Sequence, residues 1–486
     1  MSDDADTANL SLGRETAVAL IAKFVLAATG FAGVIVFARV LGVEGVGKYY
    51  FLLAAAKLGV QVSGGVSNAI KKRVSEVGVD PSEFFGLGLL VHTGLTGVAL
   101  VVAVVAYPFL QEQIGPFAFA LGVVAIVGAL GLFSLSNRLY AGIGYPGASF
   151  WTDTVRSVVT LIAQVALLVV GWRVLGLMAG LVVATLLTTA GVVVLAKVRP
   201  RFPTRETAER VWTFARWSVP NSLLQNTYMR LDVLVLGVIV GNAAVGLYEP
   251  ALRLTVPAAF IAASIGDSLT VKASGLSSLD REVADDLRNA LSYACLFAIP
   301  IFFGALAIPR ALMGVAYGPE YRAGWAALIG LALFQLFNTY RLPFDKVVSG
   351  MNRPDLRFRV SAFTLVINVP LAVALGLKYG LLGVIGATIV SEAVRVGTYL
   401  AVAHRLFDQV MLPRPLFEQF GAGAVMFGLV SALSETVAIT GWVTLVGVIG
   451  AGAVTYFGVL VAISPHFRLT VRSVLDDLGV ARAAGL

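Results

Sequence analysis

The chain has 486 residues, of which 58% are apolar and only 13% are charged, with a formal net charge of +8. Soluble globular proteins carry about 25% charged residues, so this composition, with recurring apolar runs of about 20 residues, indicates a membrane protein with many spans. The short loops exclude a soluble catalytic domain, and the single cysteine, Cys295, excludes disulfides and cysteine-rich metal sites.

The apolar runs predict an all-α polytopic membrane protein of about 14 helices. The N-terminal stretch MSDDADTANLSLGRETA is acidic and lacks the basic region and cleavage site of a signal peptide, so we expect the first run to remain as a span. Pro250 and Pro257 are expected to kink the eighth span. The expected spans are residues 16–40, 46–67, 84–107, 116–136, 151–171, 176–196, 217–240, 244–268, 288–311, 323–346, 358–377, 381–403, 418–437 and 441–463.

The distribution of basic residues between the loops predicts the orientation. Loops that follow even-numbered spans are rich in arginine and lysine, whereas the opposite loops hold only Lys48, Arg173, Arg310, Arg322 and Lys378. The positive-inside rule then places both termini in the cytoplasm of a cell-membrane protein. The net positive charge is explained by these loops, so we expect no nucleic-acid partner.

The chain contains an internal repeat. LGVEGVGKY at 41–49 aligns with VGNAAVGLY at 240–248, and AGIGYP at 141–146 aligns with SGMNRP at 349–354. Six expected spans separate the copies, so the halves share one orientation and form parallel lobes of six helices. The expected divisions are a first lobe at 1–197, a basic cytoplasmic linker at 198–216, a second lobe at 217–405, a two-helix extension at 406–463 and a cytoplasmic tail at 464–486.

Two lysines lie inside expected spans with no acidic residue within one helical turn, Lys23 and Lys57. A charge at the bilayer centre costs at least about 2.5–3.5 kcal/mol, so such residues are candidates for functional sites. Lys23 lies nearer a span end, where a lysine can extend to the interface. Lys57 lies near mid-span and is the better candidate for binding an anion.

The other charges within spans fall into close groups along the sequence. Arg230 and Asp232 are two residues apart and so point to different helix faces; they are expected to contact other helices, water or a substrate, with Asp232 the candidate coupling group. Residues at i,i+3 or i,i+4 can instead neutralise each other within a helix. The pairs with that spacing are Asp153 with Arg156, Glu249 with Arg253, Arg341 with Asp345, and Glu392 with Arg395.

Enzyme and metal motifs are missing from the sequence. GVGK at 45–48 lacks the rest of a nucleotide-binding loop, and neither HExxH nor GxSxG occurs. The three histidines are far apart, so we expect no metal site, no cofactor and no catalytic residue.

Four stretches resemble the Wzx-type polysaccharide flippases, of the superfamily that also holds the MATE drug exporters and the lipid II flippase. They are FARVLGVEGVGKYY, LVLGVIVGNAAVGLYEPALRL, VAYGPEYRAGW and SGMNRPDLR. The resemblance implies two six-helix lobes, often with two added helices, and alternating access. The implied substrate is an isoprenoid phosphate- or diphosphate-linked oligosaccharide that moves from the cytoplasmic to the outer leaflet.

We therefore predict a lipid-linked oligosaccharide flippase for cell-surface polysaccharide or glycoprotein glycan assembly, not an enzyme. Expected partners are the lipid-linked substrate, membrane lipids, and a glycan polymerase or oligosaccharyltransferase. An ion gradient or the membrane potential would drive transport, with Glu249 and Glu392 as coupling or structural charges beside Asp232. The predicted substrate-binding residues are Lys23, Lys57, Arg230, Arg253 and Arg341.

Three other functions fit the sequence less well. A MATE-like antiporter of small molecules is the main alternative, but those exporters typically carry a first-lobe acidic residue that is missing here apart from Glu44 at a turn. A membrane glycosyltransferase or ligase would need acidic catalytic residues in a sizeable outer loop. A scaffold that transports nothing gives no reason to retain charges within the membrane.

Overall fold

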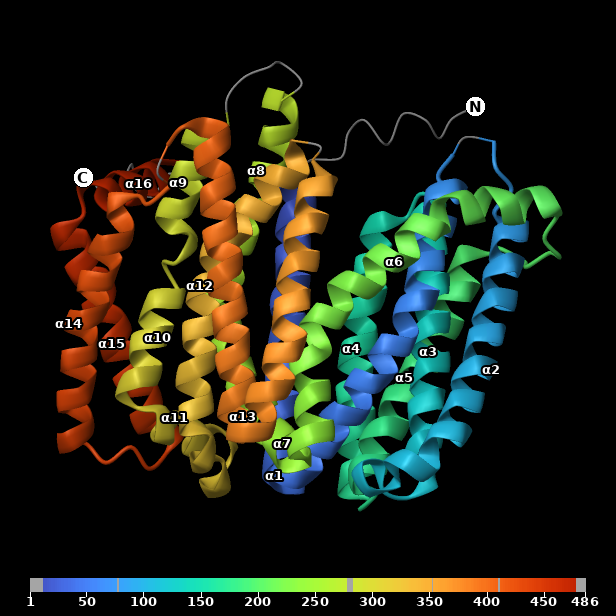
Figure 1. Cartoon of the computed structure of the whole chain (residues 1–486), viewed down its shortest axis with the longest axis horizontal. Helices are drawn as coiled ribbons and strands as arrows, with labels where there is room; N and C mark the ends of the chain where they lie inside the picture. Colours follow the sequence, from blue (N-terminus) through green and yellow to red (C-terminus); the bar gives the residue numbers. More distant parts are fainter. Residues whose placement is uncertain (1–11, 77, 278–282, 352, 410, 478–486) are drawn as a thin grey trace. The chain divides into compact units, whose positions relative to one another are not determined.

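The computed structural model describes residues 12–76, 78–277, 283–351, 353–409 and 411–477, and these residues form helices joined by turns (Figure 1). The helices that contain most of the expected spans of the first half are α1 (Leu12–Val74), α2 (Pro81–Ile114), α3 (Phe117–Gly142), α4 (Pro146–Val169), α5 (Arg173–Ala196) and α6 (Arg205–Val235), followed by η2 (Leu236–Val240). The remaining elements are α7 (Asn242–Thr255), η3 (Val256–Ala259), α8 (Phe260–Ser277), α9 (Ala284–Ala294), α10 (Ala298–Ala307), α11 (Pro309–Tyr317), η4 (Pro319–Gly324), α12 (Trp325–Gly350), α13 (Pro354–Phe407), α14 (Arg414–Thr436), α15 (Trp442–Ile463) and α16 (Pro465–Asp477).

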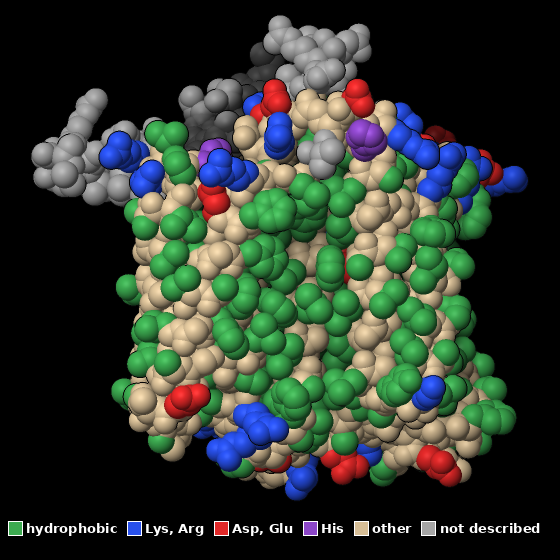
Figure 2. All heavy atoms as spheres, turned by 60° about the vertical axis from the view of Figure 1, so that its left-hand side comes forward, with side chains coloured by type: hydrophobic (Ala, Val, Ile, Leu, Met, Phe, Trp, Pro, Cys, Tyr) green, Lys and Arg blue, Asp and Glu red, His purple; other side chains and the backbone are tan. Residues whose placement is uncertain are grey.

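The predicted all-α polytopic membrane fold is confirmed. Within the described ranges, 11 helices are long and apolar enough to cross a membrane. On the face in Figure 2, charged side chains gather towards the two ends of the helices, and the band between them is mainly hydrophobic. Such a band is the surface that a bilayer covers.

The predicted count of 14 spans is not confirmed. α1 and α13 each contain two expected spans, joined at Gly42 (φ 68°) and Gly380 (φ 60°), where the backbone leaves the helical conformation. The expected span 217–240 falls in α6 and η2, which are not among the 11 helices. The eighth expected span is interrupted at η3, which contains Pro257, as the proline suggested.

The chain divides into two compact units, Met1–Gly246 and Leu247–Leu486. In unit 1, α1 packs along α3 and α6, and α4 packs along α5. In unit 2, α12 packs against α8 and α13, while α14 packs against α10 and α15. The border between the units lies after the expected linker at 198–216, because α6 and η2 pack with the helices of unit 1.

The repeat is visible in the backbone of unit 1. Gly42 and Gly241 are equivalent positions, and both have positive φ (68° and 112°) with ψ near 180° (−178° and 172°). Only glycine adopts this conformation readily, so each glycine ends one helical arm and starts the next at the same place in the repeat. The two copies therefore share a turn geometry as well as a sequence pattern.

Two further glycines pack the repeated turns against each other. A Cβ on Gly47 would lie 1.7 Å from the carbonyl oxygen of Asn242, and a Cβ on Gly246 would lie 1.8 Å from the carbonyl oxygen of Val43. Gly47 is equivalent to Gly246 in the repeat and Val43 to Asn242, so the contact is reciprocal, as in a two-fold interface. Small residues allow membrane helices to approach this closely. We call this contact the glycine crossing.

Alanine at Gly47 or Gly246 is expected to force the two turns apart. Overpacking of this kind costs about 1–3 kcal/mol, so Gly47→Ala and Gly246→Ala should lower the melting temperature of the purified protein by several degrees. Gly97→Ala in α2 is the matched control, because a Cβ there meets nothing within 4 Å. Equal melting temperatures for all three variants would show that the crossing is not tightly packed.

Candidate functional site

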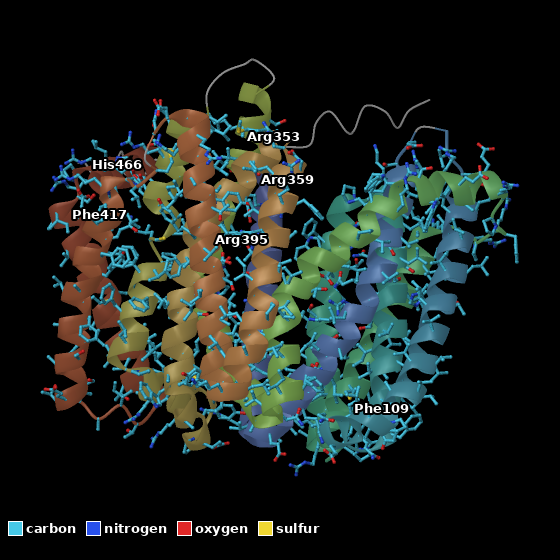
Figure 3. The ribbon with its side chains drawn as sticks, in the orientation of Figure 1. Phe109, Arg353, Arg359, Arg395, Phe417 and His466 are labelled. Atoms are coloured by element: carbon cyan, nitrogen blue, oxygen red, sulfur yellow. The ribbon has the colours of Figure 1, made fainter. Side chains whose placement is uncertain are left out.

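Four charged residues form a buried cluster between α12 and α13 in unit 2. Arg341 and Asp345 lie on α12, and Glu392 and Arg395 lie on the second arm of α13. Their side chains are between 0% and 9% exposed. Figure 3 shows Arg395 partway along α13, away from the helix ends. We call these residues the buried charge cluster.

Arg341 is at the centre of the cluster. Its Nη1 donates to Oδ2 of Asp345, and its Nε donates to Oε1 of Glu392. Its Nη2 donates to Oδ1 of Asn338 at 2.7 Å. Arg395 completes the ring, with Nη2 3.8 Å from Oδ2 of Asp345 and Nη1 3.9 Å from Oε2 of Glu392. The two predicted helical pairs are thus one interhelical network.

The cluster is electrically balanced, with two cations and two anions. Tyr399 adds a hydroxyl that donates to Oδ1 of Asp345, and Arg395 Nη2 donates to Oγ of Ser361 at 3.1 Å. Burying a charge is tolerated when it is paired and hydrogen-bonded. The geometry therefore supports a structural role, in which the cluster fastens α12 to α13. A substrate contact by Arg341 stays a prediction.

A second charged pair lies in α7. Glu249 is buried, with a side chain 2% exposed, and its Oε2 is 3.7 Å from Nε of Arg253. The Arg253 side chain is 34% exposed. This pair has the predicted i,i+4 spacing, and the partial exposure of Arg253 leaves it accessible to a ligand.

Three predicted site residues lie on α1 and α6, which pack along each other in unit 1. Lys57 on α1 is half-buried, and Gln61 donates from Nε2 to the Lys57 carbonyl at 3.1 Å. On α6, Arg230 is half-buried and Asp232 is 8% exposed. The Lys23 side chain lies outside the described residues.

A polar group in unit 1 was not predicted. His92 on α2 donates from Nε2 to the Gly128 carbonyl at 2.9 Å, so its Nδ1 accepts from the Ser63 hydroxyl at 3.2 Å. Arg138, expected in a loop, lies inside α3 and donates to the Gly64 carbonyl at 2.6 Å.

The described part of the chain holds no group of three or more His, Cys, Asp or Glu side chains that could bind a metal ion. The charged residues in the membrane helices instead contact other protein groups, as in the buried charge cluster. What the arrangement offers chemically is half-exposed cations on α1, α6 and α7, rather than a coordination site or a nucleophile with its base.

Removing one charge from the buried charge cluster should destabilise the protein strongly. Glu392→Gln leaves a buried guanidinium without its counter-charge, and breaking a buried pair in this way costs about 3 kcal/mol or more. Glu209→Gln is the control, because Glu209 pairs with Arg205 at the surface, where the side chains are 65% and 92% exposed. Such an exposed pair contributes at most about 1 kcal/mol.

Thermal unfolding of the purified variants checks this expectation. A melting temperature of Glu392→Gln equal to that of Glu209→Gln would contradict the structural role of the cluster.

Two proteins of Haloferax volcanii are similar to this chain over most of its length. The chain is 24% identical over 448 residues to a protein of Haloferax volcanii named "Probable low-salt glycan biosynthesis flippase Agl15", covering 90% of this chain and 91% of that protein. It is 26% identical over 469 residues to "Probable flippase AglR" of the same organism, covering 92% and 95%.

Solved structures share the fold. A structure described as lipid II flippase MurJ in an inward closed conformation aligns with a TM-score of 0.75 and 16% identity, covering 91% of this chain and 98% of that one. An inward-facing MATE family transporter of the MOP superfamily aligns with a TM-score of 0.59 and 17% identity, covering 78% and 95%.

A family described as "Polysaccharide biosynthesis protein" matches residues 36–324. This match takes in the glycine crossing, Lys57, and the charges of α6 and α7. Because it covers more than half of the sequence, the chain belongs to this polysaccharide biosynthesis protein family.

Proposed function

We propose that the protein is a flippase that moves an isoprenoid phosphate-linked oligosaccharide from the cytoplasmic to the outer leaflet of the cell membrane. Its family membership and two relatives named as flippases, one for glycan biosynthesis, support this function. The fold shared with MurJ supports a transporter rather than an enzyme. The glycan so delivered would serve a polymerase or an oligosaccharyltransferase on the outer side.

The single observation that carries the proposal is the position of Lys57. It lies 15 residues after the turn at Gly42 and 17 before the end of α1 at Val74, which is about 22–25 Å from either end at 1.5 Å per residue. It is also half-buried rather than enclosed. A partly exposed cation at mid-membrane fits an anionic cargo such as a phosphate or diphosphate.

Exposure ranks the remaining substrate-binding candidates. Arg230 is half-buried and the Arg253 side chain is 34% exposed, so a guanidinium at either position is accessible to a phosphate. Arg341 is enclosed by the buried charge cluster, so it ranks last among the predicted substrate contacts. A neutral sugar chain would add polar contacts, whereas the isoprenoid tail would remain in the lipid.

Transport in our proposal proceeds by alternating access, with both termini in the cytoplasm. The membrane potential or an ion gradient supplies the energy. Asp232 is the proposed coupling group, because it is a buried carboxylate on α6, the helix that also carries Arg230. Buried carboxylates of transporters commonly relay charge.

Removal of the Lys57 ammonium should block flipping. In a strain that lacks the gene, lipid-linked oligosaccharide should accumulate on the cytoplasmic leaflet, where an impermeant glycan-modifying enzyme added outside does not reach it. Restoring Lys57→Ala at equal expression should leave the defect, since the phosphate loses its counter-charge, whereas Lys57→Arg should restore at least part of the activity. Glu209→Gln, at the surface, should behave as the native protein.

Outer-leaflet glycan at the native level in a strain lacking the gene, with no second flippase present, would contradict the flippase proposal. Such a result, combined with drug efflux that tolerates Lys57→Ala, would favour the MATE-like antiporter.

Neutralising the proposed coupling group should separate transport from its driving force. Asp232→Asn keeps the size of the side chain, so substrate should still bind while transport ceases to respond to an imposed ion gradient or potential. Proteoliposomes with a defined gradient measure this response. A gradient response equal to that of the native protein would exclude Asp232 as the coupling group.

A further inference from the structure

Residues 197–217 lie across one end of unit 1 rather than within the membrane-crossing helices. The backbone N–H of Arg201 donates to the Ser82 carbonyl at 3.0 Å, and the hydroxyls of Thr204 and Thr207 donate to Oε2 of Glu83 at 2.8 and 2.6 Å. Figure 1 shows the first turns of α6 running across this end before the helix turns along α1. We call residues 197–217 the surface linker.

The contacts of Arg201, Thr204 and Thr207 fix the depth of this part of the surface linker. Glu83 lies in the first turn of α2, a 34-residue helix that is long and apolar enough to span a membrane. A segment bonded to this first turn lies at the level where α2 enters the bilayer. That level is the headgroup region, where Trp and Tyr are enriched in membrane proteins.

The inner face of the surface linker is occupied by protein. Arg210 donates to Oε2 of Glu76 at 2.7 Å and receives a bond from Nε of Arg73 at its carbonyl. Hydrogen bonds from Arg73 and then Arg210 hold the pKa of Glu76 below its usual range, so this attachment is ionic at neutral pH. Val211 and Ala215 of the surface linker are also on this inner face and are buried.

The outer face combines large aromatic rings with positive charge. Phe202, Trp212 and Trp217 are 86%, 67% and 72% exposed. Five cations of the surface linker are exposed: Lys197, Arg199, Arg201, Arg205 and Arg216. The Arg216 guanidinium lies 5.7 Å from the centre of the Trp217 ring. Aromatic rings beside basic side chains are the composition of segments that lie in the membrane interface.

We infer that the surface linker binds the anionic headgroups of phospholipids in the leaflet at this end of the helices. Charge complementarity selects this occupant, because the linker holds six Lys and Arg residues against two Glu residues. Arg201, Arg205 and Arg210 pair with carboxylates of the chain, so Lys197, Arg199 and Arg216 are the cations that face the lipid phosphates. Guanidinium groups bind phosphate oxygens in a two-pronged geometry, and the rings enter the headgroup layer beside them.

The opposite end of α5 supplies a matched comparison. Trp172 is 56% exposed and precedes Arg173, also exposed, at the start of α5. Lys197 follows the other end of this 24-residue helix. Both ends therefore carry exposed tryptophan and a cation near the membrane boundary, but only the linker end carries a cluster of cations. Both ends are expected to touch lipid, and only the linker end is expected to prefer anionic lipid.

Quenching of tryptophan fluorescence by brominated lipids tests the inference on the full-length protein in vesicles. One variant retains Trp212 and Trp217, with the other four tryptophans changed to phenylalanine, and a second retains only Trp172. Each is reconstituted with equal amounts of brominated phosphatidylglycerol or brominated phosphatidylcholine. Both leaflets then have the same composition, so the orientation of insertion does not matter.

Quenching of Trp212 and Trp217 should be at least twofold stronger with the anionic lipid, and high salt should reduce the difference. Trp172 should be quenched equally by both lipids. Adding Arg199→Gln and Arg216→Gln should remove the preference while the protein keeps its elution volume in size-exclusion chromatography. Equal quenching of Trp212 and Trp217 by the two lipids, or no quenching by either, would overturn the inference. The test does not depend on what the protein transports.

Discussion

The cost of placing charge in hydrocarbon shapes the membrane region of this protein. The buried charge cluster meets that cost with four charges of balanced sign and a hydroxyl from Tyr399, so that α12 and α13 are held together by ionic and hydrogen-bonded contacts. In unit 1, the buried His92 on α2 has a hydrogen bond at each ring nitrogen, one to Ser63 on α1 and one to Gly128 on α3. Lys57 differs because it is half-buried, and this accessibility gives it a different proposed role.

The glycine crossing adds a geometrical constraint to this electrostatic one. Two copies of one sequence pattern meet with their backbones in contact, through Gly47 and Gly246. A reciprocal contact between repeats is self-complementary, because the same pair of repeat positions meets twice. The surface linker, at the cation-rich end of unit 1, would hold that end at the bilayer surface.

Much of the fold followed from the sequence because it depends on local patterns. Apolar length predicted the membrane helices, and repeated landmarks such as Gly42 and Gly241 predicted equivalent turns, which the backbone angles show. The number of membrane helices was harder to predict, because a glycine turn joins two expected spans into one continuous helix in α1 and in α13. Packing of α6 along α1 places the border between the compact units after Gly246. This border depends on contacts distant in sequence, which spacing alone does not reveal.

The candidate site was predictable only within single helices. Spacing predicted that Arg341 pairs with Asp345 and Glu392 with Arg395, but the union of the two pairs across α12 and α13 required the three-dimensional structure. The role of His92 was not predictable, because its bond to the Gly128 carbonyl leaves no sequence pattern.

The most direct test of the account is the flipping rate of the purified protein in proteoliposomes. The rate is that at which an isoprenoid phosphate-linked oligosaccharide becomes accessible to an external glycan-modifying enzyme. The native protein should transfer the substrate, and Lys57→Ala with an unchanged melting temperature should reduce the rate at least tenfold. Equal rates for the two proteins would contradict the central role of Lys57, and a native rate no faster than that of protein-free vesicles would contradict the flippase itself.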